Sequence, residues 1–421
     1  MRVPAAALRM TTIDFSITPQ PLTSHHAMNR RNFLTSTAAA GLAFAAHAAE
    51  PARKTRVGII GHTGKGDYGH GLDTMWLKLP ETEIVGVADL NPAGLEKALA
   101  KLKVTVGFAD YREMLAKAKP EVVAIGMRNI ELHREVALAS IAAGVRGIYI
   151  EKAFCRTPAE ADEIVAACTK AGVKLAIAHR NRYHPALPAV EKLVADGTLG
   201  KLLEIRCRGK EDARGGSLDL WVLGSHLLNL AAFFAGKPVA CTATVLQDGK
   251  PATKADVKDG AEGVGPLAGN EVHARYETER GVPVFFDSIA NAGDKAAGFG
   301  LQLIGTKGVI DLRIDEQPLA HLLAGNPFDP VMEPRAWTPI TSAGLGQPEP
   351  LLDVRSQTGD HLLPGRDLIA AIRDDREPLC SAADGRLVVE MICAVFESHR
   401  LGGQRVAFPL ANRQNPLAQL P

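Results

Sequence analysis

Short apolar runs alternate with amphipathic stretches over residues 54–178. The runs are rich in β-branched residues and are bounded by glycine or charged positions, which is typical of buried parallel strands. We predict strands at 56–60, 83–88, 104–108, 122–125, 147–150 and 174–178, and helices at 72–79, 92–102, 111–117, 133–143 and 158–171. Strands that alternate with helices in this way predict a parallel sheet with helices on both faces.

The pattern changes after Gly236. Short β-rich runs at 240–246, 271–276, 282–289, 301–304 and 309–312 predict hairpins of one large, mostly antiparallel sheet. Helices expected near 368–373 and at 386–401 would cover that sheet. Segment 248–270 is too long for a simple hairpin turn and is either a loop over the cleft or a disordered tip. The predicted fold class is α/β, with one domain at 54–178, a second α/β domain at 179–410 and a tail at 411–421.

Residues 1–48 have the pattern of an export leader. Arg30 and Arg31 precede an apolar run of about 13 residues, shorter than the ~20 that a membrane span needs. The run ends in small residues, so we expect a twin-arginine signal that is cleaved after Ala48, with Met28 as the candidate start. The alternative is a mitochondrial-type or disordered basic tail. The leader predicts a periplasmic or otherwise extracytoplasmic protein.

Composition narrows the class of partner. The 421 residues include 48 Lys and Arg against 47 Asp and Glu, which leaves no basic surplus for nucleic acid or anionic lipid. Small molecules are the expected partners, and no membrane span is predicted.

The six cysteines form no CxxC pair and are expected to be buried thiols. Glu271 and His273 would face one side of a strand, but two ligands do not make a metal site, so we predict none.

A glycine-rich turn, residues 61–71, follows the first strand. Such a turn, with a helix after it, lets the backbone approach a pyrophosphate. Two registers compete for the Gly-x-Gly-x-x-Gly pattern. The literal match begins at Gly64, three residues late, whereas the pattern that begins at Gly61 stands in the usual place and has Thr63 for the middle glycine. We favour the second register, with the extra glycines widening the loop.

The second strand ends at Asp89, where a carboxylate would accept hydrogen bonds from the adenosine ribose and disfavour a 2′-phosphate. The chain has a strand, a glycine-rich turn, a helix, a second strand and an acidic residue in this order. This order predicts a Rossmann dinucleotide-binding domain that favours NAD over NADP. A plain phosphate-binding or structural loop is the alternative. The expected cofactor contacts here are Gly61, His62, Thr63, Gly64, Gly66 and Asp89.

Two further strand ends carry polar residues. Lys152 follows the fifth strand, at the edge where open α/β sheets bind ligands; the alternative is a surface lysine paired with Glu151. The polar and aromatic segment 179–185, with Arg182 and Tyr183, follows the sixth strand and would either contact a polyhydroxy substrate or form a hydrogen-bonded domain seam.

The sequence resembles the family of glucose-fructose oxidoreductase, inositol dehydrogenase and MocA over residues 54–410. The resemblance rests on the glycine turn, Val87-Ala88-Asp89 with Pro92, residues 108–115, His133, Glu151-Lys152, Arg182-Tyr183-x-Pro185, Gly215-Gly216 and Gly224-Ser225-His226. It implies an NAD(P)-dependent sugar oxidoreductase in which Lys152 bonds the reacting sugar oxygen. It also implies that Asn129, His133, Glu151 and Lys152 contact the cofactor, and by analogy alone a homodimer or homotetramer.

Two positions depart from the family pattern. Ala153 replaces a proline after the lysine, so we expect a trans bond there or a strained loop, because a cis bond before a non-proline residue costs ~2.5 to 4 kcal/mol. Val222 replaces an aspartate four residues before His226. Asp219, two helical turns before the histidine, would supply the missing carboxylate, and Asn229 would fix the histidine tautomer and contact substrate.

The expected chemistry is hydride transfer from a hydroxyl carbon of a sugar, polyol or glycoside. His226 would be the general base and Lys152 the electrostatic partner, although a lone histidine on an apolar helix is more often a core residue. Free cofactor is scarce outside the cytoplasm, so export favours a retained NAD and a redox-neutral cycle, glycoside cleavage included. A non-catalytic NAD- or sugar-binding protein is the alternative.

Overall fold

The computed structural model describes residues 53–293, 299–330 and 333–421. Residues 52–421 form one compact unit. The predicted export leader, residues 1–48, lies outside the described residues.

The N-terminal part contains a six-stranded parallel sheet with the strand order β3-β2-β1-β4-β5-β6. The strands are β1 (Thr55–Ile60), β2 (Thr82–Ala88), β3 (Gly107–Phe108), β4 (Val122–Ile125), β5 (Gly147–Ile150) and β6 (Lys174–Ile177). Strands β4 and β5 are buried along their whole length, as their continuous apolar sequences predict. This is the doubly wound Rossmann order, and the prediction of the parallel sheet is confirmed.

The helices of this sheet are α1 (Pro92–Leu102), α2 (Tyr111–Ala118), α3 (His133–Ala142) and α4 (Pro158–Ala171). Asn91 and Thr157 cap α1 and α4, accepting hydrogen bonds from Gly94 N and Glu160 N. The helix expected at 72–79 is wrong, because only a 3₁₀ turn forms there, Met75–Lys78. Gly69 and Gly71, just before it, have positive φ angles of 65° and 95°, which a right-handed helix does not tolerate.

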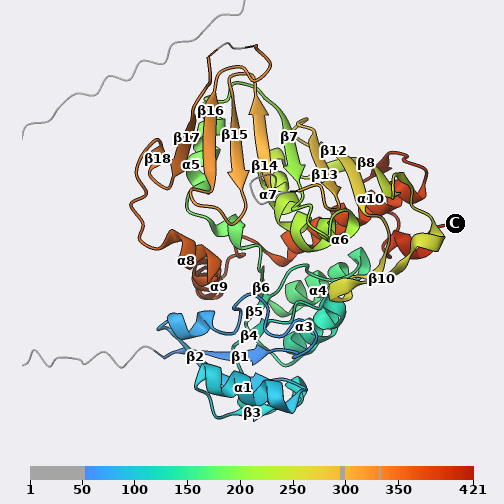
Figure 1. Ribbon diagram of the computed structural model, residues 1–421. Coiled ribbons are helices and arrows are strands. Elements are labelled where there is room, and N and C mark those ends of the chain that lie inside the picture. The colour runs from blue at the N-terminus through green and yellow to red at the C-terminus, as the bar shows by residue number, and fades with distance from the viewer. Residues whose placement is uncertain (1–52, 294–298, 331–332) are drawn as a thin grey trace, which may run out of the picture. The chain divides into compact units, whose positions relative to one another are not determined.

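The C-terminal part is built on an eleven-stranded sheet (Figure 1). Its strands are β7 (Leu202–Arg208), β8 (Pro238–Gln247), β9 (Lys250–Pro251), β12 (Glu271–Thr278), β13 (Val284–Ile289), β14 (Gly300–Gly305), β15 (Gly308–Arg313), β16 (Ala320–Ala324), β17 (Trp337–Thr341), β18 (Gly344–Leu345) and β19 (Val406–Ala407). Among the described strands of this sheet, only the β7–β13 pair is parallel. The prediction of a large, mostly antiparallel sheet is confirmed.

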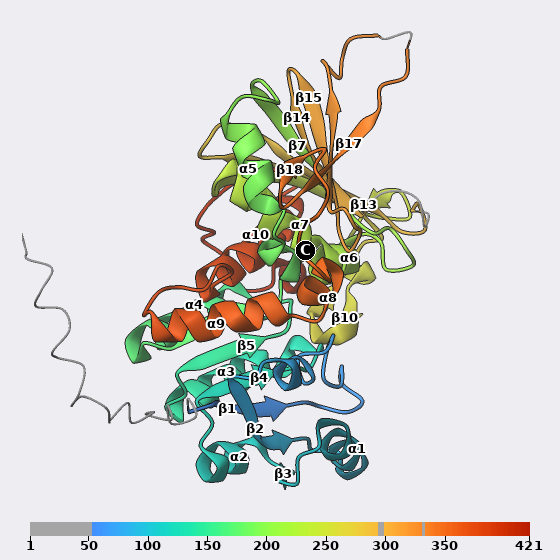
Figure 2. The ribbon, with the colours of Figure 1, turned by 90° about the vertical axis from the view of Figure 1, so that its left-hand side faces the viewer.

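The C-terminal helices α8 (Val354–Gly359), α9 (Leu362–Arg373) and α10 (Ala382–Arg400) divide between the two sheets (Figure 2). Helix α9 packs on β5, β6 and the 3₁₀ turn at 75–78, whereas α10 packs on β8 and α4. The prediction that both helices cover the antiparallel sheet is therefore wrong for α9. Its Leu368 joins the cluster of Trp76 and Tyr149 on the face of the parallel sheet that α1 also covers, through Ala98 and Leu102.

Segment 248–270 is ordered, so the expectation of a disordered tip is wrong. It contains two 3₁₀ turns (Lys254–Asp256 and Ala261–Gly263) and the hairpin of β10 (Lys258–Gly260) and β11 (Gly265–Leu267). The second 3₁₀ turn contacts the turn at Ile130–Leu132, just beyond β4. The segment thus lies against the edge of the Rossmann sheet where its strands end.

Helix α5 (Leu187–Ala195) follows the Rossmann sheet, and a longer helical stretch follows β7. That stretch consists of α6 (Ser217–Asp219), a π-helical segment (Leu220–Gly224) and α7 (Ser225–Ala235). In the part of the chain that the structure describes, residues 217–235 are the one helical stretch with the length and hydropathy of a membrane span. However, 78% of its most apolar 18 residues is buried inside the protein. It is a core helix.

Candidate active site

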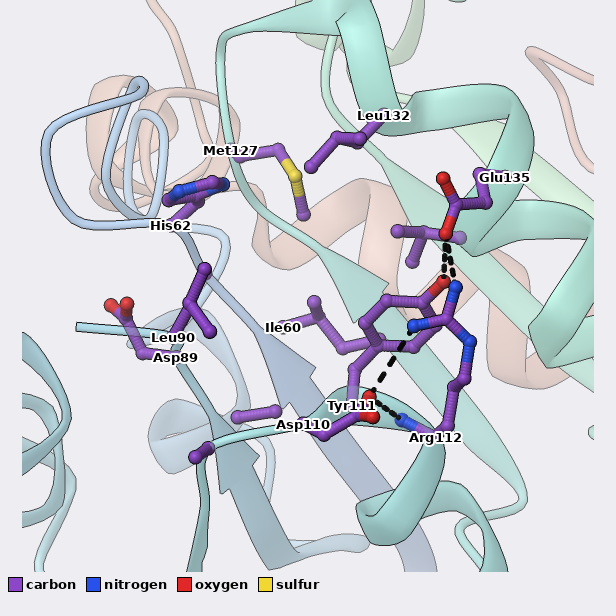
Figure 3. Close-up of a pocket in the computed structure, with 14 residues that line it drawn as sticks. Ile60, His62, Asp89, Leu90, Asp110, Tyr111, Arg112, Met127, Leu132 and Glu135 are labelled. Atoms are coloured by element: carbon purple, nitrogen blue, oxygen red, sulfur yellow. Dashed lines mark hydrogen bonds and ion pairs between the residues drawn. The ribbon is translucent and has the colours of Figure 1, made fainter. Parts of the chain in front are cut away.

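The first cavity, about 310 Å³ in volume, lies at the carboxyl ends of β1, β2 and β4. Figure 3 shows Met127 and Leu132 on one side and Tyr111 and Arg112 on the other. The guanidinium of Arg112 lies 4.5 Å from the centre of the Tyr111 ring and pairs with Glu135. An apolar slot with an aromatic wall suits a planar base such as adenine.

Asp89 lines this cavity, but its carboxylate is already engaged. It accepts hydrogen bonds from Thr63 N and Oγ1, the latter at 2.7 Å, and from Asn91 N at 2.9 Å. Asp89 therefore fastens the glycine-rich turn to the end of β2. Its carboxylate lies at the carboxyl end of β2, and its hydrogen bonds are made to groups of the protein itself.

The glycine-rich turn fits a phosphate-bearing ligand. Gly61 follows β1 directly, in the register that we favoured. At Gly66, with φ of 89°, a Cβ would lie 2.4 Å from Arg128 N, so only glycine fits. Gly64, with φ of 86°, has no atom near its missing Cβ, and its backbone is open to an approaching ligand. Because no α-helix follows the turn, the expected helix N-terminus is absent from the described turn, and the backbone itself must supply the donors.

Two residues that we predicted to contact the cofactor, His133 and Asn129, make hydrogen bonds within the protein. His133 is fully buried, with Nδ1 at 3.0 Å from Phe154 O and Nε2 at 2.8 Å from Met127 O. It ties the loop after β4 to the loop after β5, and it does not reach the first cavity. Asn129 caps the 3₁₀ turn at 130–132 by accepting a hydrogen bond from Glu131 N.

A second cavity, about 180 Å³, lies at the ends of β5 and β6, on the same edge of the sheet. It brings Lys152 and His226 together, as we predicted, and adds His70, Glu151, Arg180, Lys210, Arg214, Phe299, Asp315 and His361. Lys152 Nζ donates to Val222 O at 3.0 Å. In a π-helical segment, some carbonyl groups lack their usual helical partners. Here the carbonyl of Val222 accepts a hydrogen bond from the Lys152 ammonium group. The backbone of Val222 thus contacts the lysine where the family pattern has a carboxylate.

His226 is buried beside other basic groups. Its ring lies edge-on to the ring of His179, 5.2 Å between centres. Burial, with the charges of His179 and Lys152, lowers the pKa of His226 well below its usual value. Its Nδ1 is buried and has no hydrogen-bond partner among the described residues. The ring is therefore neutral at neutral pH.

The prediction that Asp219 partners His226 is wrong. Asp219 Oδ2 accepts from Ser288 Oγ at 2.6 Å and from Glu211 N at 3.0 Å. The π-helical segment between the two residues has more residues per turn than an α-helix, so Asp219 leaves the face of His226. Asp219 instead anchors the start of the helix to β13.

Glu151 has a partner that the sequence did not indicate. Its carboxylate, fully buried, accepts from Lys152 N at 2.8 Å and from His70, both N at 3.1 Å and Nδ1 at 2.6 Å. Burial alone would raise the pKa of Glu151, but the hydrogen bond from His70 and the charge of Lys152 hold it far below its usual range. Glu151 is thus an ionised residue of the second cavity, and the surface pair that was the alternative for Lys152 does not form.

The predicted substrate contacts lie outside the second cavity. Arg182 stacks on the Phe233 ring at 3.6 Å, and Tyr183 Oη accepts from Cys380 N at 3.2 Å. Asn229 contacts Cys380 Sγ, so it does not set the tautomer of His226. These residues form the hydrogen-bonded seam that we had kept as the alternative.

The polar lining of the second cavity comes from Arg180, in the segment that we predicted after the sixth strand, and from Lys210, Arg214 and Asp315, which sequence reasoning missed. Arg180 and Asp315 form an ion pair at 2.7 Å although they lie 135 residues apart in the sequence. No local sequence pattern predicts such a contact. The Lys152–Ala153 peptide bond is cis, so the expected trans bond is also wrong.

Residues 55–179 match the family model GFO_IDH_MocA, an oxidoreductase family with an NAD-binding Rossmann fold. The match covers the part of the chain that contains the parallel sheet and the first cavity. The resemblance inferred from the motifs is confirmed over this part of the chain, and the cofactor is NAD.

Individual proteins extend the likeness beyond these residues. Over 350 residues the chain is 23% identical to levoglucosan dehydrogenase of Pseudarthrobacter phenanthrenivorans, which covers 74% of this chain and 86% of that one. It is 29% identical to D-apiose dehydrogenase of Paraburkholderia graminis over 171 residues, which are 38% of this chain and 45% of that enzyme. The chain thus spans less than half of the apiose enzyme.

A solved structure of levoglucosan dehydrogenase in complex with NADH has a TM-score of 0.67 with this chain, at 20% identity over 85% of this chain and all of the other. An oxidoreductase from Agrobacterium radiobacter, solved with NAD+, L-tartaric acid and magnesium, has a TM-score of 0.63 at 18% identity, over 84% and 98% of the two chains. At this identity the likeness concerns the fold, which both parts of the chain share.

Proposed function

We propose that the protein oxidises a hydroxyl carbon of a sugar, polyol or glycoside with NAD. The observation that carries this proposal is the meeting of the Lys152 ammonium group and the His226 ring in the second cavity, on the edge of the sheet that holds the nucleotide cavity. A dinucleotide that binds along this edge would bring its reactive ring to the second cavity.

The side chains divide the work of such a reaction. NAD, when bound, would supply the acceptor for the hydride of the hydroxyl carbon. His226, neutral because of its lowered pKa, takes the hydroxyl proton. Lys152 stabilises the charge that develops on the oxygen. Arg180 and Asp315 offer donors and acceptors to the other hydroxyl groups of a sugar.

The nucleotide cavity supports NAD over NADP. A 2′-phosphate would meet the carboxylate of Asp89. The one arginine that lines this cavity, Arg112, is already paired with Glu135 and Asp110, so it is not free for a phosphate.

We further propose that the protein acts outside the cytoplasm with a retained NAD. The twin-arginine pattern at residues 30–31 supports export of a folded protein. A cofactor that cannot exchange must be regenerated in place, which favours a redox-neutral reaction such as epimerisation or glycoside cleavage.

The test begins with the purified, fully folded protein. Its released nucleotide is identified after denaturation, and absorbance at the NADH band is followed with levoglucosan, myo-inositol, D-glucose and methyl glucosides. Bound NAD that one of these compounds reduces supports the proposal. Stoichiometric NADP would refute the cofactor argument, and bound NAD with no response to any sugar would favour a non-catalytic binding protein. Export is tested by replacing Arg30 and Arg31 with lysine and fractionating the cells.

A further inference from the structure

The second cavity contains an acid–base pair that the proposed reaction leaves unused. It consists of His70, from the glycine-rich turn, and the buried Glu151, from the end of β5. Oxidation of a hydroxyl group needs one base, and His226 with Lys152 already supplies that chemistry.

The turn is shaped to hold His70 against Glu151. At Gly69, with φ of 65°, a Cβ would lie 2.4 Å from Gly126 O and 2.6 Å from Glu151 Oε1. Glycine therefore permits the backbone to press against the carboxylate. As a result one oxygen, Glu151 Oε1, accepts from both the backbone N and the ring Nδ1 of His70. The extra glycines of this turn thus have a role besides widening the nucleotide loop.

This contact fixes the tautomer of His70. Because Glu151 is ionised, Nδ1 must carry the proton, which leaves the Nε2 lone pair free to act as a base. The His70 side chain is 44% exposed, while the Glu151 side chain is 1% exposed. The imidazole thus reaches the cavity, and its carboxylate partner is shielded from water.

His226 has the opposite environment. Its Nδ1 lacks a partner in the described structure, and its basic neighbours oppose protonation. It also lines the cavity together with Lys152. The ammonium group of Lys152 donates to the carbonyl of Val222, which lies four residues before His226 on the same helical stretch. Lys152 and His226 therefore suit one substrate oxygen, whereas His70 approaches from a different element of the fold.

We propose that His70, held by Glu151, is a second catalytic acid–base residue, which removes the proton from the carbon next to the oxidised carbon of a sugar or glycoside. This inference rests on the proposed function, because only a carbonyl made in the first step acidifies that C–H bond.

The step balances without any further reagent. The proton moves from the carbon to Nε2 of His70, and the C–H electron pair becomes the C=C bond of an enolate whose charge lies on the oxygen near Lys152. Return of a proton to the same carbon restores or inverts that centre. Return of the hydride to the carbonyl carbon then regenerates the hydroxyl group, so the cycle consumes no external oxidant.

The experiment separates the two steps in D₂O. The NAD-containing protein is mixed with the panel sugar that reduces its NAD, the NADH band reports the first step, and NMR reports deuterium at the adjacent carbon. In His70→Gln we expect the exchange rate to fall by ~10² to 10⁴, the usual contribution of a positioned acid or base, while the rate of NAD reduction falls less than about tenfold. The control His321→Gln, on β16 and away from the lining of both cavities, should behave as wild type.

Nucleotide content and melting temperature show that each variant is folded. Glu151→Gln gives a second test, since loss of the carboxylate that holds the Nδ1 proton of His70 should slow the exchange as His70→Gln does. The inference fails if wild type reduces NAD without exchange, if His70→Gln exchanges at the wild-type rate, or if both steps fall equally, which would make His70 the hydroxyl base. If no sugar reduces the NAD of wild type, the proposed function fails and takes the inference with it.

Discussion

Replacement of Lys152 by methionine should separate catalysis from stability. The side chain is 6% exposed, and its ammonium group makes one hydrogen bond that the structure shows, 3.0 Å to Val222 O. Methionine keeps most of the volume and removes the charge. Loss of one donor to a developing oxyanion typically lowers turnover by ~10² to 10³, about 2.7 to 4 kcal/mol of barrier. Loss of a charged hydrogen bond costs only about 1.5 to 3 kcal/mol of folding free energy.

The assay is single-turnover reduction of bound NAD by the panel sugar, with nucleotide content and thermal unfolding measured in parallel. We expect stoichiometric NAD, a moderately lower melting temperature and a rate reduced at least about 100-fold. Lys192→Met is the matched control, because Lys192 lies on the surface of α5 with 78% of its side chain exposed. A rate within about threefold of wild type, under ~0.7 kcal/mol of barrier, would refute the role of Lys152. Loss of NAD from a folded variant would make the lysine a cofactor ligand instead.

Three other changes test the structure. Asp219→Ala should destabilise the fold by ~2 to 5 kcal/mol, because two buried donors, Ser288 Oγ and Glu211 N, lose their acceptor. The folded fraction should keep its turnover. A loss of turnover that matches that of a His226 variant would contradict this. Gly66→Ala should abolish retention of NAD, because its Cβ would meet Arg128 N at 2.4 Å, and normal nucleotide content would contradict the fit of the turn. His273 has a raised pKa: burial lowers it, but its two carboxylate partners outweigh that effect. Its ion pairs should therefore stabilise wild type over His273→Gln by about 1 kcal/mol or less below pH ~6.5, and chemical denaturation should show this difference disappearing as the pH rises through the raised pKa.

Two of the three histidines that line the second cavity, His70 and His226, show how environment assigns roles. His226 is buried among basic groups, and His70 is paired with a carboxylate. Both are imidazoles in one cavity, yet of the two only His70 has a carboxylate hydrogen-bond partner, which fixes its tautomer. Two bases that belong to different elements of the fold suit a reaction with two proton transfers.

Local sequence determined the Rossmann part of this protein. Strands β4 and β5 are short apolar runs, and Asn91 and Thr157 cap helices at the predicted starts. Such signals act over a few residues, through side-chain periodicity and backbone capping, so a single sequence contains them in full. Asp89 and Lys152 could be placed for the same reason, because the carboxyl end of a parallel strand is a known ligand-binding position.

Tertiary structure alone decided the rest. Helix α9 has an apolar face whose partner the sequence does not specify, and the fold packs it on β5, β6 and the 3₁₀ turn that contains Trp76. The spacing of Asp219 and His226 predicts a shared face for an α-helix, but the π-helical segment between them breaks that rule. His70 meets Glu151 across 81 residues. No local pattern encodes such a contact, since it depends on how the folded glycine-rich turn presses against the end of β5.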